Sequence, residues 1–317
     1  MFKDLKKAIK KAKSILILTH INPDGDALGS TLGFKCMLEK MGKKAAILLE
    51  KELPEMFSVF GDEFLGGEYN EEYDLVCALD CGDIARLGDL SKYFIGNTLC
   101  IDHHVSTEKF AKTSYVDSKA AATGEIIYDL AKSLKIPFDS KMASALYGAI
   151  LTDTGGFMFS NTTKKTHDII GELIKNGADF YTLNKKLIQE KDYKRHLITA
   201  ECIKRMEFLY DGKICVVVIP NSMAKELNIE DHDLNGLAQV PRTVSKVEVG
   251  ILISELEEGI LKVSLRSDEL VDVSKIAKEF GGGGHIRASG VRFRGASIEE
   301  VKNNLITEIK KQLEEDK

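Results

Sequence analysis

The chain has 317 residues, of which 44% are hydrophobic and 29% charged, and its formal net charge is −5. This length favours two domains, because single hydrophobic cores rarely grow beyond about 250–300 residues, and the composition argues against a disordered chain. The acidic balance lacks the basic footprint of proteins that bind long duplexes, whereas a short anionic substrate is compatible with it.

The first half of the chain alternates apolar runs with helical patterns. Strands are predicted at residues 14–19, 45–49, 75–79 and 98–101, and helices at 27–41, 124–133, 142–151 and 166–175. Strands that alternate with helices are typical of a parallel α/β sheet. We therefore predict an N-terminal metal-binding α/β domain with a parallel sheet over residues 1–185.

A charged segment without Gly or Pro follows, from 183 to 209, and is predicted to form a connecting helix over residues 186–210. Beyond it, strands are predicted at 214–219, 247–254, 260–265 and 290–293, with helices near 274–280 and 298–313. This pattern predicts a smaller, mixed α/β C-terminal domain over residues 211–317.

The cysteines, the N-terminus and the apolar runs of the sequence allow a prediction of the cellular location. The six cysteines include no CxxC pair, which argues against a disulfide framework and a zinc ribbon. The N-terminus lacks the features of a signal peptide, and the longest apolar runs are much shorter than the roughly 18 residues that span a bilayer. We expect a cytoplasmic protein with reduced cysteines and no membrane anchor.

Four segments place acidic and histidine residues after predicted strands or at a helix end. They contribute His20, Asp24 and Asp26, then Asp80, then His103, and finally Asp153. Each has a structural alternative, since Asp26 could cap a helix and a lone strand-end Asp often forms a turn. If the strands are parallel, however, their carboxyl ends meet at one edge and gather most of these residues in one crevice.

Burying so many unpaired carboxylates would cost several kcal/mol each, and divalent cations are the natural compensation. Imidazole and carboxylate ligands without thiolate suit manganese, iron, cobalt or, less well, magnesium. Two such ions about 3.5–4 Å apart can clamp an in-line phosphoryl displacement and activate a water. The sequence therefore predicts phosphoester hydrolysis.

These residues resemble the motifs of the DHH phosphoesterase family. The resemblance comprises His20-Ile-Asn-Pro-Asp24-Gly-Asp26, the strand-end Asp80, the triplet Asp102-His103-His104, and Thr152-Asp153-Thr154-Gly155-Gly156. The C-terminal part resembles the DHH-associated domain through Gly282-Gly283-Gly284-His285 and an upstream Ser-Leu-Arg266-Ser. Ala288-Ser289-Gly290 departs slightly from the family pattern of paired alanines and a glycine, which bears on packing.

The resemblance implies specific roles. His20 and Asp24 would hold one Mn²⁺, Asp26, His103 and Asp153 the other, and Asp80 would bridge the two ions. His104 would stay off the metals and touch the scissile phosphate or leaving oxygen, so Asp80 and His104 are the predicted catalytic residues. Asp102 could orient His103 or its loop.

Two further elements concern the substrate. The glycines at 281–284 could be a helix C-cap and flexible turn, but four in a row exceed what a cap needs. We predict that Arg266, Gly282, Gly283, Gly284 and His285 bind an anionic substrate. Arg86 also fits a family pattern, although a solvated arginine at a helix start explains it nearly as well.

Small two-domain members of the family resemble oligoribonucleases that degrade very short RNAs and dephosphorylate 3'-phosphoadenosine 5'-phosphate (pAp). That function is the leading expectation, with short single-stranded RNA or a small nucleotide as the partner and a homodimer left open. Alternatives are hydrolysis of cyclic di-AMP or linear pApA, inorganic pyrophosphatase, and a catalytically inactive nucleotide-binding protein. The Ser-Arg-Lys-Lys element of the pyrophosphatase branch does not occur in this sequence.

Overall fold

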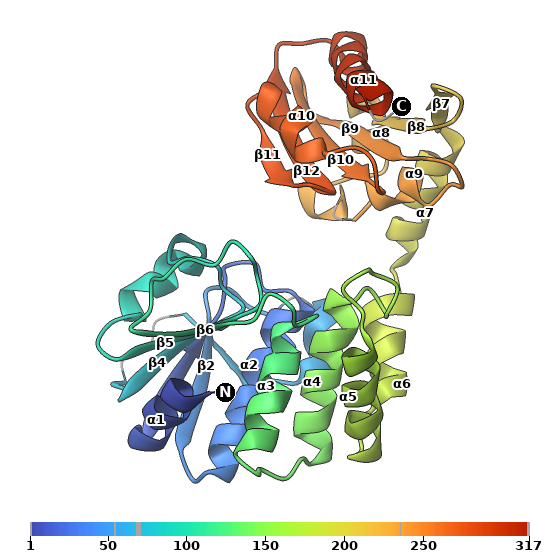
Figure 1. The fold of residues 1–317 in the computed structure, drawn as a ribbon. Helices are drawn as coiled ribbons and strands as arrows, with labels where there is room; N and C mark the ends of the chain where they lie inside the picture. Colours follow the sequence, from blue (N-terminus) through green and yellow to red (C-terminus); the bar gives the residue numbers. More distant parts are fainter. Residues whose placement is uncertain (1, 54, 68–70, 235, 316–317) are drawn as a thin grey trace. The chain divides into compact units, whose positions relative to one another are not determined.

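A computed structural model describes residues 2–53, 55–67, 71–234 and 236–315 (Figure 1). The chain divides into two compact units, Met1–Glu190 and Lys191–Lys317, each with a sheet of its own.

The sheet of the first unit contains, among the described residues, six strands that pair only in parallel. They are β1 (Ser14–Leu18), β2 (Lys44–Leu49), β3 (Phe64–Gly66), β4 (Leu75–Leu79), β5 (Thr98–Asp102) and β6 (Thr113–Val116). Their order is β3-β2-β1-β4-β5-β6, so the strand order reverses between β1 and β4. This confirms the predicted parallel α/β fold, and such a reversal point is where open α/β sheets bind ligands.

Both faces of this sheet are buried. Ile15 and Ile17 of β1 pack in the helix-covered core, whereas Leu16 and Leu18 pack on the opposite face with apolar residues of η2 (Ala85–Tyr93). The division follows from the alternation of side chains along a strand. Burial on both faces explains why these strands read as continuous apolar runs in the sequence.

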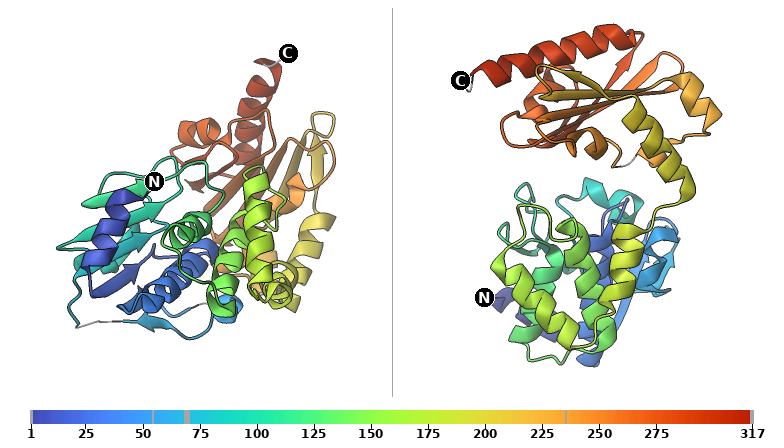
Figure 2. Two further views of the ribbon diagram at one scale, coloured as in Figure 1. Left: turned by 60° about the horizontal axis from the view of Figure 1, so that its bottom comes forward. Right: turned by 90° about the vertical axis from the view of Figure 1, so that its right-hand side faces the viewer.

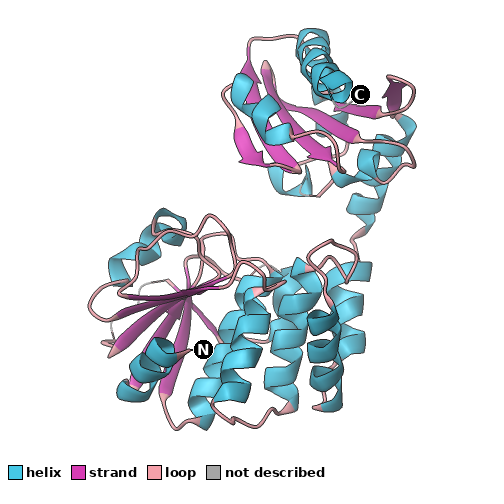
Figure 3. Ribbon diagram, viewed as in Figure 1, coloured by secondary structure: helices cyan, strands magenta, loops and turns pink. Residues whose placement is uncertain are grey.

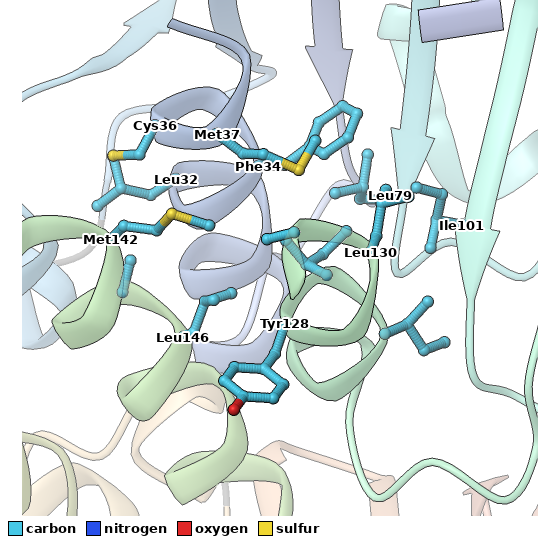
Figure 4. Packing of buried hydrophobic residues seen from close by; sticks show 14 of the residues in the cluster. Leu32, Phe34, Cys36, Met37, Leu79, Ile101, Tyr128, Leu130, Met142 and Leu146 are labelled. Carbon is cyan, nitrogen blue, oxygen red and sulfur yellow. The ribbon is translucent and has the colours of Figure 1, made fainter. Parts of the chain in front are cut away.

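Helices cover one face of the sheet side by side (Figures 1 and 3). Besides η2, the described helical segments of this unit are α1 (Lys3–Lys11), α2 (Gly25–Lys40), η1 (Glu55–Phe60), α3 (Thr123–Ser133), α4 (Ser140–Asp153), α5 (Lys164–Lys175), α6 (Phe180–Leu183) and η3 (Asn184–Gln189). Figure 4 shows Phe34 and Met37 of α2 close to Leu130 of α3 and Leu79 of β4.

Two glycines allow α2 to lie very close to α4. A Cβ added at Gly29 would be 2.4 Å from the Ala145 carbonyl oxygen, and one added at Gly33 would be 2.4 Å from Leu146 Cδ2. A side chain at Gly29 would meet the backbone of α4 and push the helices apart, and one at Gly33 would displace the Leu146 side chain. The close packing holds the beginning of α2 near the end of α4.

The structure differs from the single connecting helix expected over 186–210. The π-helix η3 ends at Gln189, and Glu190 after it has extended backbone angles of φ −69° and ψ 128°. A new helix, α7 (Tyr193–Lys204), then begins after Asp192, whose side chain accepts the Arg195 N–H as an N-cap. Because the whole segment has a high helix propensity, its sequence predicts one continuous helix. Asp192 instead caps the beginning of a second helix.

The second unit has a mixed sheet, described in the order β11-β12-β10-β9-β8-β7. The strands are β7 (Glu207–Leu209), β8 (Ile214–Ile219), β9 (Val249–Glu257), β10 (Ile260–Ser267), β11 (Gly283–His285) and β12 (Ala288–Arg294). Strands β8 and β9 pair in parallel, and the other described pairs are antiparallel. This confirms the prediction of a mixed α/β C-terminal part.

Helices lie on both faces of this second sheet (Figure 2). They are α7, α8 (Asn221–Glu226), η4 (Asp231–Leu234), α9 (Gln239–Arg242), α10 (Val273–Glu279) and α11 (Ile298–Glu315). Residues of α10 and α11 form one core, and residues of α7 and α8 form another on the opposite face. Within the described ranges, no helix combines the length and apolar character needed to cross a membrane.

Candidate metal centre

The predicted metal ligands lie on four segments that meet at the carboxyl edge of the first sheet. His20 follows β1, Asp80 follows β4, and His103 follows β5. Leu18 is in register with Ala78, and Leu79 with Ile101, so these loops leave the sheet at similar levels. Asp153 is the last residue of α4. The structure thus brings together all six predicted ligands: His20, Asp24, Asp26, Asp80, His103 and Asp153.

Asp80 lies between two imidazoles. Its Oδ2 is 3.8 Å from His20 Nε2, and its Oδ1 is 3.7 Å from His103 Nε2. Two ligand sets have donor atoms within 4.8 Å of one another, and they are His20–Asp24–Asp80 and Asp26–His103–Asp153. A carboxylate that presents one oxygen to each set suits a bridge between two cations.

Asp24 and Asp26 have different local roles. Asp24 is the N-cap of α2, because its Oδ1 accepts the Ala27 N–H at 3.0 Å. The capping alternative for Asp26 is therefore wrong, since Asp26 is buried in the first turn of α2. Gly25 permits a close approach rather than a left-handed turn, because an added Cβ would be 2.4 Å from Thr152 Cγ2. This approach sets the loop against the end of α4, beside Asp153.

His104 is held by Asp102. Its Nδ1 is 2.8 Å from Asp102 Oδ1 and 3.7 Å from Asp80 Oδ1. Asp102 also accepts the Thr107 hydroxyl and the His103 backbone N–H. Asp80, His103 and His104 satisfy the same 4.8 Å criterion, but the hydrogen bond to Asp102 occupies His104 Nδ1. Asp102 was expected to orient His103 or its loop. It accepts the His103 backbone N–H, but the imidazole ring that it orients is that of His104.

The Asp102–His104 contact shifts both pKa values. Burial acts to raise the pKa of Asp102, but hydrogen bonds from His104 and Thr107 outweigh it and hold this pKa below its usual range. The hydrogen bond to Asp102 raises the pKa of His104 against the opposing effect of burial. A protonated imidazole with Nδ1 fixed in this way can donate its other proton from Nε2.

Two imidazole nitrogens have no hydrogen-bond partner within the described part of the chain, and both are buried. They are Nε2 of His20 and Nε2 of His103. His103 Nδ1 lies 3.2 Å from the Ala120 carbonyl oxygen, an arrangement that puts the proton on Nδ1 and frees the Nε2 lone pair. Burial lowers the pKa of His20 and so favours the neutral form that binds metals.

Burial and mutual repulsion also disfavour the ionised form of the clustered carboxylates. Burial raises the pKa of Asp80 well above its usual range, and Asp26 and Asp24 raise it further. Burial has the same effect on Asp26, where Asp153 and Asp24 add to it. A cation would reverse both shifts, because it stabilises the ionised form. The buried, unpartnered nitrogens and clustered oxygens fit divalent cations, and imidazole and carboxylate donors without thiolate are compatible with manganese, iron or cobalt.

Sequence reasoning missed the segment that positions two of these carboxylates. The Thr123 N–H and Gly124 N–H donate to Asp26 at 2.6 and 3.0 Å, and the Thr123 hydroxyl donates to Asp80 Oδ1 at 3.0 Å. The N-terminus of α3 therefore supports Asp26 and Asp80 together. The only signal in the sequence is a run of small residues, Ala120-Ala121-Ala122-Thr123-Gly124, before a helical pattern.

A pocket of about 560 Å³ adjoins the first ligand set. It is lined by His20, Ile21, Asn22, Asp24, Asp83, Ala85 and Arg86. Its walls are the loops after β1 and β4, at the reversal point of the strand order. Of the lining residues that are not predicted ligands, only Arg86 is singled out individually by its sequence pattern, and that pattern gives it no definite role.

The predicted substrate residues lie together in the second unit. Arg266 of β10 pairs with Ala288 of β12, which pairs with His285 of β11. Side chains in such a row project from the same face of a sheet, so Arg266 and His285 flank the small Ala288. The neighbouring Leu265 is buried in the core on the other face. Burial lowers the pKa of Arg266, which lies far above neutrality in its ordinary state.

The glycine run divides into two parts. Gly281 has φ +76° and follows α10, and the Gly282 N–H donates to the Ala277 carbonyl at 2.7 Å, so the helix-cap alternative is correct for this first part. Gly283 and Gly284 instead begin β11, where a Cβ added at Gly284 would be 2.5 Å from the Ala288 carbonyl oxygen. The run therefore caps a helix and then lets β11 lie close to β12.

Both units match known families. The DHH family, N-terminal domain, matches residues 14–150, and the DHHA1 domain matches residues 211–315. A probable bifunctional oligoribonuclease and PAP phosphatase NrnA from Streptococcus mutans is 31% identical over 290 residues, which cover 91% of this chain and 92% of that protein. The chain belongs to the DHH family. This confirms the resemblance seen in the motifs.

Other DHH relatives agree over most of the chain. The bifunctional oligoribonuclease and PAP phosphatase NrnA of Thermus thermophilus is 29% identical, with 94% of this chain and 90% of that protein covered. The solved structure of an exopolyphosphatase-related protein from Bacteroides fragilis superposes with a TM-score of 0.87 at 24% identity, covering 96% and 95% of the two chains. That likeness supports the fold.

Two further similarities are more distant. RecJ of Thermus thermophilus, solved in complex with Mn²⁺, has a TM-score of 0.54 at 14% identity, covering 97% of this chain and 53% of RecJ. The cyclic-di-AMP phosphodiesterase GdpP of Bacillus subtilis is 24% identical, and the match covers 95% of this chain but 48% of GdpP.

Replacing Thr123 of this DHH protein by valine is expected to weaken metal binding by roughly 10- to 100-fold, as is usual when a hydrogen bond to a ligand is lost. Valine keeps the size of threonine but cannot donate to Asp80 Oδ1. Titration calorimetry with Mn²⁺ measures the effect. Thr123→Ser keeps the hydroxyl and is expected to bind metal like the wild type, and equal affinity of the valine variant would contradict the role given to this contact.

The stability of the metal-free DHH protein is expected to fall as the pH rises. Asp26 and Asp80 have raised pKa values, so the folded state keeps protons that the unfolded chain releases above the ordinary carboxylate pKa of about 4. Urea unfolding at about pH 5 and about pH 8 in the presence of a chelator measures this slope. Saturating Mn²⁺ should oppose it, because the metal binds the ionised carboxylates.

The matched variant is Asp26→Asn, which removes one of the two titrating groups and should reduce the slope. A metal-free wild type that becomes more stable over this pH range, with no difference from Asp26→Asn, would show that these carboxylates do not carry the predicted electrostatic cost.

Proposed function

We propose that this DHH protein uses two Mn²⁺ ions to hydrolyse short oligoribonucleotides to mononucleotides and to remove a phosphate from pAp. That it is a hydrolase of the DHH phosphoesterase family follows from its family and its relatives. The observation that carries the proposal is the position of Asp80, with one oxygen facing His20 and the other facing His103. The names of two relatives that match over nine tenths of their length support the substrates.

Different residues of the first unit would bind the metal ions and transfer the proton. His20, Asp24, Asp26, Asp80, His103 and Asp153 would hold the two ions. Ions bound there would supply Lewis acidity at the phosphoryl group and lower the pKa of water. His104, which Asp102 orients through Nδ1, would donate a proton from Nε2 to the leaving oxygen. Manganese is one of the metals that suit mixed imidazole and carboxylate donors.

In the second unit, Arg266 and Gly282 to His285 would bind the substrate away from the reacting phosphate. Arg266 has a side-chain hydrogen bond only to the Leu265 carbonyl among the described residues, which leaves most of its donors available for an anion. The exposed backbone of Gly283 and Gly284 and the His285 ring add further donors on β11.

Arg266→Ala is therefore expected to raise KM for a dinucleotide by about tenfold or more, because a hydrogen bond to a charged group contributes roughly 1.5–3 kcal/mol. Steady-state kinetics with a 5'-labelled diribonucleotide measures the change. Mn²⁺ affinity should stay at the wild-type value. Lys278→Ala, which removes an exposed charge from α10, is the control, and an unchanged KM for Arg266→Ala would contradict the assignment.

The direct test of the proposed function is a substrate panel with the purified full chain and Mn²⁺. Ribonucleotides of two to five residues and pAp are expected to yield mononucleotides and AMP, with much slower turnover of cyclic di-AMP and pyrophosphate. No hydrolysis of either short RNA or pAp would overturn the proposal.

Hydrolysis of cyclic dinucleotides is the less favoured alternative. The relative named as a cyclic-di-AMP phosphodiesterase is more distant, and this chain matches only 48% of its length. Faster turnover of cyclic di-AMP than of diribonucleotides in the same panel would reverse this order.

A further inference from the structure

The pocket beside the metal centre has two unlike walls. His20 and Asp24, on one wall, belong to the first ligand set. The other wall carries Arg86, with Asp83 and Ala85 before it in the chain. A volume of about 560 Å³ exceeds the size of a phosphate and falls within the range of about 300–1,000 Å³ that is usual for small-molecule sites.

The backbone of Arg86 is fixed on both sides. Its N–H donates to Asp83 Oδ1 at 3.0 Å, and its carbonyl oxygen accepts the Ile21 N–H at 2.9 Å. The two walls are also in close contact at Gly88, where an added Cβ would lie 2.2 Å from Ile21 Cγ2. The Arg86 backbone therefore has a fixed position on the pocket wall.

The guanidinium of Arg86 is half-buried and has no ion pair or hydrogen bond among the residues that the structure describes. Its Nη1 lies above Gly82, at 3.9 Å from the position of an added Cβ, and Asp102 Oδ2 is 4.0 Å from the same point. The cation thus lies close to the Asp102–His104 pair without being neutralised by it. A half-buried guanidinium in this state lacks the anion that its planar donors suit best.

We propose that Arg86 binds a phosphate group of the substrate through two of its N–H groups, and that Ile21, Asn22 and Ala85 receive the attached nucleoside. The chemistry recognised is that of a nucleoside monophosphate unit, either the product or one end of a short RNA. A bidentate guanidinium contact fits two non-bridging phosphate oxygens, and the apolar and amide side chains fit a sugar and base. This assignment rests on the proposed function for the identity of the ligand.

The test is calorimetric titration of the Mn²⁺-loaded full chain with AMP and, separately, with adenosine. Arg86→Ala is expected to weaken AMP binding by roughly 10- to 100-fold, the usual effect of losing hydrogen bonds to a charged group. Adenosine and Mn²⁺ affinities should change by less than about twofold, as for a surface substitution. Lys92→Ala, which removes an exposed cation from the same element η2, should leave all three affinities unchanged.

Arg86→Lys keeps the charge but loses the planar pair of donors, so an intermediate AMP affinity is expected and this variant provides the test if Arg86→Ala does not fold. AMP affinity equal to that of the wild type in a folded Arg86 variant would overturn the inference. An equal loss of adenosine affinity would also overturn it, because the phosphate would then not be the group recognised.

The two proposals fail in different ways. If the wild type hydrolyses short RNA but binds AMP independently of Arg86, only the inference about Arg86 fails. If AMP binding depends on Arg86 but no phosphoester is hydrolysed, only the proposed function fails.

Discussion

Asp80→Ala is expected to abolish hydrolysis of every phosphoester that the wild-type chain turns over, with a loss of about a thousandfold or more, because metal ions contribute several kcal/mol to such transition states. Asp80 faces both His20 and His103, so its removal takes one oxygen from the first ligand set and one oxygen that faces His103 of the second. Initial rates on a diribonucleotide and on pAp measure the effect. Both activities should disappear together.

The control for this substitution is Asp89→Ala, which removes an exposed acid from η2 without touching the ligand sets. It should retain wild-type rates. Asp80 also has a left-handed backbone with φ 54°, so Asp80→Asn, which tolerates that conformation better than alanine does, separates loss of the carboxylate from backbone strain. One activity that survived in both Asp80 variants would require a second reaction site.

His104→Ala is expected to lower kcat by about 10²- to 10⁴-fold while leaving the bound metal in place, because a positioned proton donor contributes an effect of this size. The Nδ1 atom of His104 is engaged by Asp102, which leaves Nε2 for the leaving oxygen. Steady-state rates and metal analysis of the same preparation test both halves of the prediction.

His232→Ala, which changes an exposed histidine of the second unit, serves as the control. If His104→Ala lost one equivalent of metal together with its activity, His104 would be a ligand, in line with the third combination of Asp80, His103 and His104. An unchanged kcat would contradict a role in proton transfer.

The strands that are buried on both faces were predictable, because such burial requires continuous apolar runs in the sequence. Strands β1, β2, β4 and β5 are apolar on both faces and were located to within about two residues, the usual uncertainty of such boundaries. The edge strands β3 and β6 were missed, because neither Phe64–Gly66 nor Thr113–Val116 contains a buried residue. Short edge strands of this kind carry little periodic signal.

The candidate site was predictable where side chains carry the chemistry. The six acidic and histidine residues are recognisable from their positions after strands and from the family motifs, and the fold brings them together. The contacts that orient them were not predictable, because the donors to Asp26 are the backbone N–H groups of Thr123 and Gly124, which any sequence offers. The pairing of Asp102 with the His104 ring depends likewise on the turn after β5.

Metal content, determined by elemental analysis of the Mn²⁺-loaded full chain after removal of free metal, tests the central claim most directly. The wild type is expected to retain about two ions per chain, as in two-metal phosphoesterases, whereas Asp80→Ala should retain fewer. Chelator treatment should remove both the ions and the activity, and Mn²⁺ should restore them. Full hydrolytic activity in a chain that has been shown to contain no metal would contradict the two-metal centre.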